Sequence, residues 1–338
     1  MATMKDVAKH ANISVTTVSN FINNRKKLKK ETRDKINQAI KETGYVRNIS
    51  ATNLKRSKDD LKTIGIITIA NKNPFFMELF HKIEKECYEQ GCIVISCFLH
   101  FNELEIKNYI NLMQSRVDGI ILVSLEQANN DYIHEIHATP IIPIIFGVRS
   151  VETLCGTTEF NINNELGGYM SGKLLMNKGH VKIACITGPL KLKATGERIS
   201  GFEKARKEYS VSKENIQLIE SDFSYQGGVD AVYSLFSSSF KPTAILCHND
   251  LMAIGAQNAS LELGLKIPED ISIIGYDGIE FSKMSFPPLT TIEIPIKNIA
   301  KQLVTGLKSK ITDSKTLIKI EVNPLIKLRG TVGKVGSS

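Results

Sequence analysis

The chain has 338 residues, of which 42% are hydrophobic and 23% charged, and its formal net charge is +8. The length predicts two or three domains, and the composition is typical of a globular protein with enough apolar residues for a core. No apolar signal region is expected at the N-terminus, and the longest apolar runs, 64–70 and 141–146, are too short to span a bilayer, which excludes a transmembrane protein.

The excess positive charge lies at the N-terminal end of the chain. Residues 1–62 hold 15 Lys and Arg against 6 Asp and Glu, whereas residues 63–338 hold 28 against 29. A basic head followed by a nearly neutral body is typical of proteins that bind nucleic acid. The alternative is a solvated basic tail, but this head also shows helical periodicity.

Residues 4–23 predict two short helices joined by a tight turn. The first helix has an apolar face from Val7 to Ala11, and Asn12-Ile13-Ser14 interrupts it with residues that favour a turn and a helix N-cap. The second helix covers about 15–22. Its outer face carries small, mostly uncharged side chains suited to base edges and phosphates, namely Val15, Thr16, Ser19, Asn20 and Asn23. This pattern favours a DNA-binding helix-turn-helix over an ordinary helical hairpin.

A third helix is predicted over residues 31–44, where Ile36, Ala39 and Ile40 form an apolar stripe and Gly44 provides a C-terminal stop. Three helices around one small core make a self-contained head of about fifty residues, near the lower size limit for independent folding. The polar segment 46–62 then predicts a linker that includes one short helix.

Together these motifs resemble the LacI/GalR family of bacterial transcription regulators. KDVAKHANIS-VTTVSNFIN is similar to the family's helix-turn-helix, ETRDKINQAIKETGY to its third helix and SATNLK to its hinge helix, with matching spacing. The resemblance implies that three residues read bases (Val15, Thr16 and Asn20) and that others contact phosphates (Ser14, Thr17, Ser19, Asn23 and Tyr45). It also implies that Leu54, beside Lys55, wedges into the minor groove and kinks the duplex.

Four residues of the head depart from the family pattern, and two of them are Lys30, where the family usually has Ser or Asn, and Arg47, where Pro is commonest. Asn12 stands where the family usually has Gly, and Asn20 stands where Arg or His is common. Because Asn pairs well with adenine, the operator base preferred at that position is expected to differ from the common family site.

From residue 63 onward the pattern changes to short hydrophobic strands that alternate with amphipathic helices, which predicts parallel sheets built from βαβ units. The predicted strands are 63–70, 92–99, 119–125, 141–146, 182–187, 243–248, 271–276 and 290–294, and the predicted helices include 75–90, 103–115, 165–178, 198–209 and 250–263. So many strands fit two doubly wound halves better than one sheet.

This body resembles the periplasmic-binding-protein-like core of the same family. The resemblance implies a helix-turn-helix domain at 1–47, a hinge helix and linker at 48–62, and an effector-binding and dimerisation core at 63–330. The core is expected to divide into one subdomain of about 63–160 plus 292–322 and another of about 161–291. The fold class is therefore an α-helical head joined to an α/β core of two parallel-sheet subdomains.

In open α/β sheets, ligands bind beyond the carboxyl ends of the strands. That rule singles out residues that follow the predicted strands: Asn73, Phe75, Phe76, Ser124, Arg149, Arg198, Phe223, Asn249, Asp250 and Asp277. Aromatic faces with a few Asp, Asn and Arg side chains suit a sugar or a flat heterocycle. Each residue taken singly also has a structural alternative, such as a core position for Phe75 or Phe76 and a helix N-cap for Asp250.

The family resemblance agrees with this set, because NPFF, the Arg198 of ERISGF, DF, ND and GYD look like its ligand motifs. Purine-type members of the family are the most similar in wording, but Leu192 and Ala194 stand where those proteins carry polar purine contacts. We therefore expect a small carbohydrate effector, a sugar or sugar phosphate, rather than a purine.

Other chemical signals in the sequence are weak. The stretch from Gly167 to Lys173 resembles half of a phosphate loop, but Leu174 replaces the Ser or Thr that binds magnesium, so helix packing is the favoured interpretation. The six cysteines and seven histidines show no metal-ligand spacing, and no catalytic set is evident. We expect free thiols, no cofactor, no metal and no enzymatic activity.

The favoured hypothesis is a cytoplasmic homodimer that acts as a transcriptional repressor. It binds pseudo-palindromic double-stranded operator DNA, and a small effector that it also binds controls its affinity for that DNA. The first rival is a solute-binding protein of the same core fold, and the second is an enzyme on a doubly wound fold. The solute-binding rival predicts a signal peptide and no basic head. The enzyme hypothesis predicts a set of catalytic residues that come together at one site.

Overall fold

The computed structural model describes residues 3–22, 28–44, 62–69, 73–99, 103–123, 142–147, 159–314, 316 and 318–336. These belong to two compact units, Met1–Asp60 and Leu61–Ser338, which we call the head and the core. Several expected site residues lie outside the described residues: Asn23, Tyr45, Leu54, Lys55, Ser124 and Arg149. Nearly all of the expected hinge segment lies outside them as well.

The head contains α1 (Met4–Ala11), α2 (Val15–Ile22) and α3 (Lys30–Thr43). Thr3 and Asp6 form a capping box at the start of α1, and Ser14 accepts a hydrogen bond from the Thr17 backbone N–H at the start of α2. Asn12, in the turn between the helices, has a left-handed φ of 55°. This conformation explains why a residue that tolerates it, Asn or Gly, is needed there.

One small core joins the three helices of the head. Val7 on α1, Val18 on α2 and Ile36 on α3 are each 0% exposed and form one cluster. Their spacing is the apolar face that the sequence predicts. Val15, on the outer side of α2, is 43% exposed. The helix-turn-helix prediction is therefore confirmed as structure.

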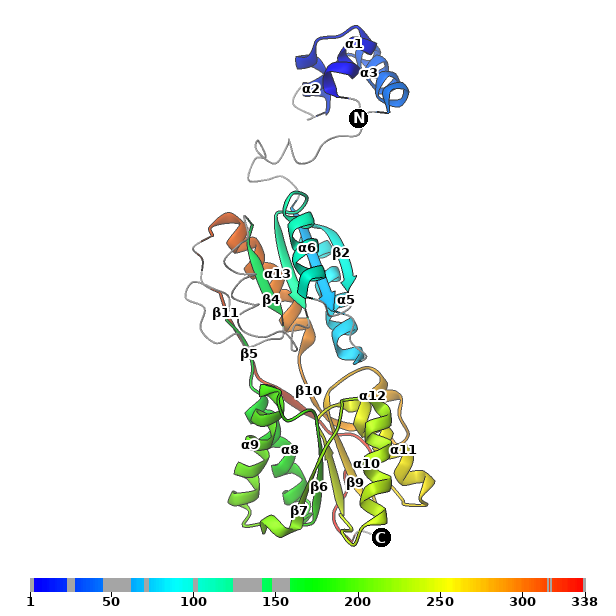
Figure 1. Cartoon of the computed structure of the whole chain (residues 1–338), viewed down its shortest axis with the longest axis vertical. Helices are drawn as coiled ribbons and strands as arrows, with labels where there is room; N and C mark the ends of the chain where they lie inside the picture. The colour runs from blue at the N-terminus through cyan, green and yellow to red at the C-terminus, as the bar shows by residue number, and fades with distance from the viewer. Residues whose placement is uncertain are drawn as a thin grey trace. The chain divides into compact units, whose positions relative to one another are not determined.

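The first lobe of the core is a parallel sheet covered on both faces (Figure 1). Its strand order is β2 (Ile93–Leu99), β1 (Thr63–Ile69), β3 (Gly119–Val123) and β4 (Ile144–Gly147). Alternate residues of the central strands point to opposite faces. Ile121 and Val123 pack with α5 (Pro74–Glu89) and α13 (Ile296–Thr312), whereas Ile120 and Leu122 pack with α6 (Glu103–Gln114).

The second lobe is a larger sheet with strand order β12-β10-β9-β8-β6-β7, in which only β12 runs antiparallel to its neighbour. Its strands are β6 (Ile183–Thr187), β7 (Ile216–Glu220), β8 (Ala244–Cys247), β9 (Ser272–Asp277), β10 (Thr290–Glu293) and β12 (Leu325–Lys327). Its helices are α8 (Asn164–Asn177), α9 (Lys193–Glu208), α10 (Tyr225–Ser237), α11 (Asp250–Glu262) and the short α12 (Phe281–Met284), with a 3₁₀ turn, η1 (Lys213–Asn215), before β7.

The chain passes between the lobes more than once. A separate two-stranded parallel sheet pairs β5 (Glu159–Ile162) with β11 (Lys319–Val322), and β12 then returns to the second lobe. The expected subdomain division at residues 291–292 falls inside β10, which pairs with β9. The expected fold class, a helical head with two parallel-sheet lobes, is confirmed.

Candidate functional site

Three of the expected effector residues meet where the two lobes face each other. Asp277 ends β9 with a left-handed φ of 105° and is only 6% exposed. Its Oδ2 accepts a hydrogen bond of 2.8 Å from the Asn73 side-chain amide of the first lobe. Its Oδ1 lies 4.0 Å from Nη2 of Arg198 on α9. The strand-end rule therefore brings Asn73, Arg198 and Asp277 together, as the sequence predicts.

The Arg198 guanidinium is held in one plane by its neighbours. It lies 3.7 Å from the ring centroid of Tyr276, Nε donates to Asn164 Oδ1 at 3.1 Å, and Nη1 donates to the His248 carbonyl oxygen. Stacking on an aromatic ring and fixed hydrogen bonds orient the fork of an arginine for recognition of a planar or anionic group. Arg198 can therefore present a fixed positive group beside Asp277.

Close packing of two helices sets the position of Arg198. At Gly168 on α8, an added Cβ would collide with the backbone carbonyl of Arg198, so the helices approach more closely than any other residue would allow. The same stretch, Gly167 to Lys173, is the one that resembles half of a phosphate loop. Its interpretation as helix packing is confirmed, since Gly167, Gly168 and Gly172 are buried within α8.

Asp250 positions the loop that carries Asp277. It is 0% exposed, and its Oδ2 accepts hydrogen bonds of 2.8 Å from the backbone N–H groups of both Gly278 and Ile279. Its Oδ1 accepts a third, of 2.5 Å, from the Thr291 hydroxyl. Burial raises the pKa of Asp250, and the nearby Asp277 charge adds to that shift, whereas the three hydrogen bonds oppose it. The Asp250 side chain therefore has a structural role, since its hydrogen bonds hold the loop that follows Asp277.

Burial dominates the electrostatics of the site. It raises the pKa of Asp277 to about 6, although the Arg198 charge and the Asn73 hydrogen bond act in the opposite direction. It lowers the pKa of His248 to about 3, and the Arg198 charge lowers it further. The Nδ1 atom of His248 is buried without a hydrogen-bond partner. At neutral pH the site therefore combines a guanidinium, a carboxylate and a neutral imidazole.

The other expected residues form the surroundings of this group. Asn249 caps α11, and its Nδ2 donates to the Phe223 carbonyl oxygen at 2.8 Å. Phe223 has a left-handed φ of 65°. Phe75 and Phe76 are 4% and 5% exposed and pack edge to face, with 5.3 Å between ring centroids, in the main core cluster. The structural alternative to a ligand-binding role, a position in the core, is therefore confirmed for Phe75 and Phe76.

Sequence reasoning missed several neighbours of the site. His248 directly follows β8, and Tyr276 lies within the GYD motif, so the strand-end rule had the signal to find both. Asn164 had no such signal, because its role depends on how α8 and α9 pack. Glu78 on α5 was also missed, and its Oε1 accepts a 2.9 Å hydrogen bond from the backbone N–H of Glu280.

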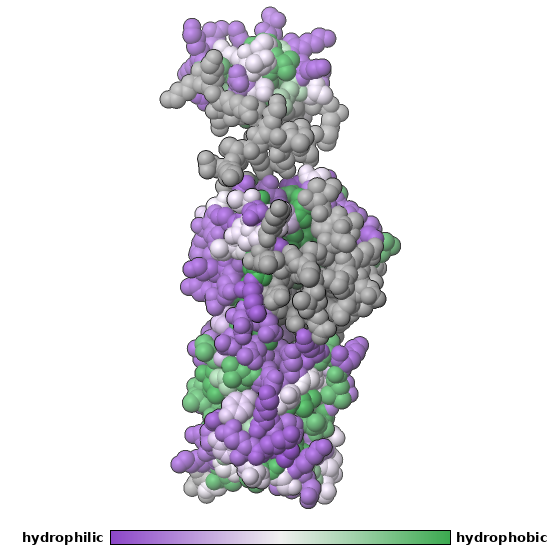
Figure 2. All heavy atoms as spheres, turned by 90° about the vertical axis from the view of Figure 1, so that its left-hand side faces the viewer, coloured by the Kyte–Doolittle hydropathy of each residue, from purple (hydrophilic) through white to green (hydrophobic). Residues whose placement is uncertain are grey.

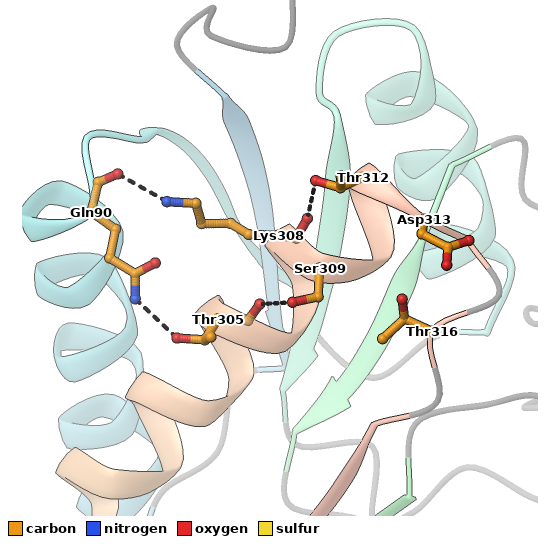
Figure 3. Close-up of a pocket in the computed structure, with 7 residues that line it drawn as sticks. All are labelled: Gln90, Thr305, Lys308, Ser309, Thr312, Asp313 and Thr316. Atoms are coloured by element: carbon orange, nitrogen blue, oxygen red, sulfur yellow. Dashed lines mark hydrogen bonds between the residues drawn. The ribbon is translucent and has the colours of Figure 1, made fainter.

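A hollow of about 560 Å³ opens between the C-terminal ends of α5 and α13 (Figure 3). Its polar groups are already engaged: Lys308 Nζ donates to the Gln90 carbonyl oxygen at 3.2 Å, and the Ser309 and Thr312 hydroxyls donate to carbonyls of their own helix. Thr305, also on α13, accepts from the Gln90 amide at 3.2 Å. These contacts explain the hollow without a ligand.

The outer side of α2 is the candidate DNA-reading surface. Val15 and Thr16 are exposed, Ser19 and Asn20 are half-buried, and the Thr17 hydroxyl contacts Ser14 Oγ at 2.8 Å. The visible side of the head carries mostly hydrophilic residues around a less polar centre (Figure 2). The described part of this surface therefore matches the predicted pattern of small polar side chains.

Three expected absences concern only the described part of the chain. Five cysteines there are free thiols (Cys87, Cys92, Cys97, Cys185 and Cys247), and no His, Cys, Asp and Glu side chains gather there in a group able to hold a metal ion. None of the helices described has both the length and the apolar character needed to cross a bilayer.

Comparisons with known families identify both parts of the chain. Residues 3–48 match the family model described as bacterial regulatory proteins of the lacI family, and residues 173–332 match a periplasmic binding protein-like domain. The chain is 35% identical to the HTH-type transcriptional repressor PurR of Aliivibrio salmonicida, over 99% of this chain and 100% of that protein. PurR of Vibrio vulnificus is likewise 35% identical, over 99% and 100%.

Solved structures show the same architecture. The lac repressor dimer bound to operator and the anti-inducer ONPF has a TM-score of 0.78 and 26% identity, with 98% of this chain and 99% of that chain covered. A LacI family regulator from Enterococcus faecium with bound ribose has a TM-score of 0.71 and 29% identity, covering 80% and 99%. This chain therefore belongs to the LacI family of bacterial transcription regulators.

Proposed function

We propose that this chain is a dimeric, operator-binding repressor whose DNA affinity is set by a small effector bound between the core lobes. The observation that carries the proposal is the union, in one chain, of a helix-turn-helix head with a buried guanidinium–carboxylate site at strand ends. Its full-length relatives are named as repressors rather than enzymes. Action on DNA places the protein in the cytoplasm.

On the DNA side, α2 enters the major groove and its outer residues contact bases and phosphates. The proposed base readers are Val15, Thr16 and Asn20, and the proposed phosphate contacts are Ser14, Thr17, Ser19, Asn23 and Tyr45. Leu54, with Lys55, is the proposed minor-groove wedge. The excess positive charge of residues 1–62 supports this assignment, because phosphate contacts supply much of the affinity for DNA.

On the effector side, Asp277 and Arg198 are the proposed polar anchors. A carboxylate accepts from hydroxyl groups, and a fixed guanidinium binds a hydroxyl or a phosphate. Phe223 is the proposed aromatic contact, Phe75 and Phe76 support the site from the core, further contacts come from Ser124 and Arg149, and Asn249 and Asp250 position the loops. We propose a sugar or sugar phosphate, in keeping with the family member solved with ribose.

The effector site and the DNA-binding head are coupled through the hinge segments of the dimer, which have two states. Effector binding changes how the lobes close, and closure changes the spacing of the two hinge segments in the dimer, which fold on DNA or separate from it. This proposal uses the domain boundaries 1–47, 48–62 and 63–330 expected from the sequence.

The second copy binds along exposed apolar surface on both lobes. Among the described strands, β2 lies at the edge of its sheet, and its Ile93, Ile95 and Phe98 are 48%, 37% and 50% exposed. In the second lobe, Phe281 and Met284 of α12 are 53% and 69% exposed. An unprotected apolar edge strand invites association, and the related lac repressor was solved as a dimer. We call these five residues the dimer face.

Deleting the head tests the DNA assignment. Fluorescence anisotropy should show that the full-length chain binds duplexes from upstream of its own gene, and that a variant lacking residues 1–60 does not. Equal binding by the truncated variant would remove the repressor proposal and leave the solute-binding alternative.

A thermal-shift screen tests the effector class, because a ligand that binds the folded state raises its melting temperature. Sugars, sugar phosphates and purine bases form the panel. We expect stabilisation by a carbohydrate that disappears in Arg198→Ala and Asp277→Ala. Stabilisation by a purine alone would replace the carbohydrate proposal.

A further inference from the structure

Among the residues that the structure describes, two hydrogen bonds reach from the first lobe to the short segment from the end of β9 to Glu280. The Asn73 amide donates to Asp277 Oδ2 at 2.8 Å, and the Glu280 backbone N–H donates to Glu78 Oε1 at 2.9 Å. Asn73 is the N-cap of α5 and Glu78 lies in the same helix, so both partners in the first lobe come from one end of α5. We call these four residues the clasp.

The second-lobe side of the clasp is held in place. Asp250 binds the backbone N–H groups of Gly278 and Ile279, between the two clasp residues of that loop. On the opposite side of Asp277, Arg198 is fixed by Tyr276 and by its hydrogen bonds. The loop is therefore anchored to its own lobe, so that movement of α5 away from it opens the clasp.

Both ends of the Asn73 amide already have roles within the protein. Its Oδ1 accepts from the Phe75 backbone N–H at 3.1 Å and so caps α5, while its Nδ2 occupies Asp277. An effector hydroxyl that seeks Asp277 Oδ2 competes with this amide, because a carboxylate lone pair accepts one strong hydrogen bond at a time. Asn73 thus lies where an effector would make its own contact.

We propose that Asn73 is a clasp residue that holds the lobes together while the cleft is empty, and that the effector group reaching Asp277 displaces it. Asn73 thereby sets effector affinity by competition rather than by contact, a role that revises its sequence-based prediction as a ligand. This inference rests on the proposed effector site. Its test uses neither effector nor DNA, so its failure is distinguishable from failure of the proposed function.

The variants separate the clasp from helix capping and from charge. Asn73→Ser keeps an oxygen to cap α5 but removes the amide donor. Glu78→Ala removes the acceptor for Glu280, whereas Glu78→Gln retains an acceptor oxygen. Glu84→Ala is the matched control, because Glu84 lies on the same helix, has a side chain 52% exposed and contacts His81 at 3.7 Å. Thermal melting followed by circular dichroism checks that each variant folds.

The measurement is amide hydrogen exchange in the effector-free, full-length chain, resolved at the Glu280 N–H, with small-angle scattering for overall opening. That N–H donates to Glu78, so faster exchange in Asn73→Ser reports separation of the lobes. We expect a rise of about five- to tenfold in Asn73→Ser and Glu78→Ala, as loss of one hydrogen bond implies, and a larger radius of gyration. Glu78→Gln and Glu84→Ala should match the wild type.

The Gly278 and Ile279 amides serve as internal references, because Asp250 holds them in every variant. Unchanged exchange at Glu280 and an unchanged radius of gyration in Asn73→Ser would overturn the clasp. If Glu78→Ala does not fold, the comparison of Asn73→Ser with Glu78→Gln decides the question.

Discussion

At the scale of single residues, the candidate effector site contains buried groups whose protonation affects stability in opposite directions. The pKa of His248 is lowered to about 3, below its usual value of 6.5. Between these two pH values the unfolded chain binds a proton on His248 and the folded chain does not. The free energy of unfolding therefore falls as pH drops below about 6.5. The pKa of Asp277 is raised to about 6 from 3.8, so the folded chain binds a proton first and stability rises as pH falls from about 6 to 4.

These two effects predict that the wild type loses little stability from this site between pH 6 and 4. Asp277 and Asp250 are buried carboxyl groups whose raised pKa values oppose the effect of His248, and Asp277→Asn removes one of them. We expect its free energy of unfolding in urea to fall more steeply over this range than that of the wild type, by up to about 1.4 kcal/mol per pH unit. Parallel pH curves for the two proteins would show that Asp277 does not titrate in this range.

Asn20 is the residue for which the sequence makes the sharpest specificity prediction. A bidentate contact from Asn to adenine is worth about 1–3 kcal/mol of discrimination. Asn20→Ala should therefore weaken binding to an A·T-containing operator about ten- to hundredfold while changing non-specific binding little. Asn37→Ala, an exposed position on α3, is the control. Gel shifts in which both DNAs lose affinity equally would show that Asn20 contacts only the backbone.

At the scale of elements, the approach of α8 to α9 positions Arg198. Gly168→Ala would place a methyl group against the Arg198 backbone carbonyl, and we expect it to cost about 1–3 kcal/mol in stability and to displace Arg198. Gly196→Ala, on the same helix as Arg198 but in open space, should instead gain up to about 1 kcal/mol. Chemical denaturation measures both, and similar changes in the two variants would contradict close helix packing as the cause.

The elements with strong periodicity were predictable from the sequence, and those with competing signals were not. Predicted strands such as 63–70 and 182–187 correspond to β1 and β6 within a residue. However, α9 begins at Lys193 rather than 198, because Gly196 in its first turn lowers the helical signal. In α10, which lies outside the predicted ranges, Gly227 and Gly228 have the same effect.

The site was predictable only to the extent that strand ends determine it. Asn73, Arg198 and Asp277 follow strands along the chain and meet in space, so one topological rule finds them. The engagement of Asp250 with Gly278 and Ile279, and of Asn164 with Arg198, depends on loop paths and helix packing between distant segments. Those contacts could not be predicted from the spacing of residues in the sequence.

At the scale of the whole molecule, the dimer face should decide the oligomeric state. Ile95→Lys places a charge on the exposed edge strand and should convert the dimer to monomer in sedimentation velocity, with weaker operator binding as a result. Val181→Lys is the control, since Val181 is also an exposed apolar residue, at 52%, but lies before β6 in the other lobe. A persistent dimer in Ile95→Lys would place the interface elsewhere.

The central claim is that a basic three-helix reader and a neutral two-lobed sensor act together as a two-fold symmetric, sequence-specific repressor. Selection of bound duplexes from a random-sequence pool by the full-length chain at moderate salt tests it most directly. We predict enrichment of an inverted repeat whose half-site centres lie about one helical turn apart, with loss of all enrichment when residues 1–60 are absent. Recovery of no inverted repeat, or of the same sequences by the truncated chain, would contradict the claim.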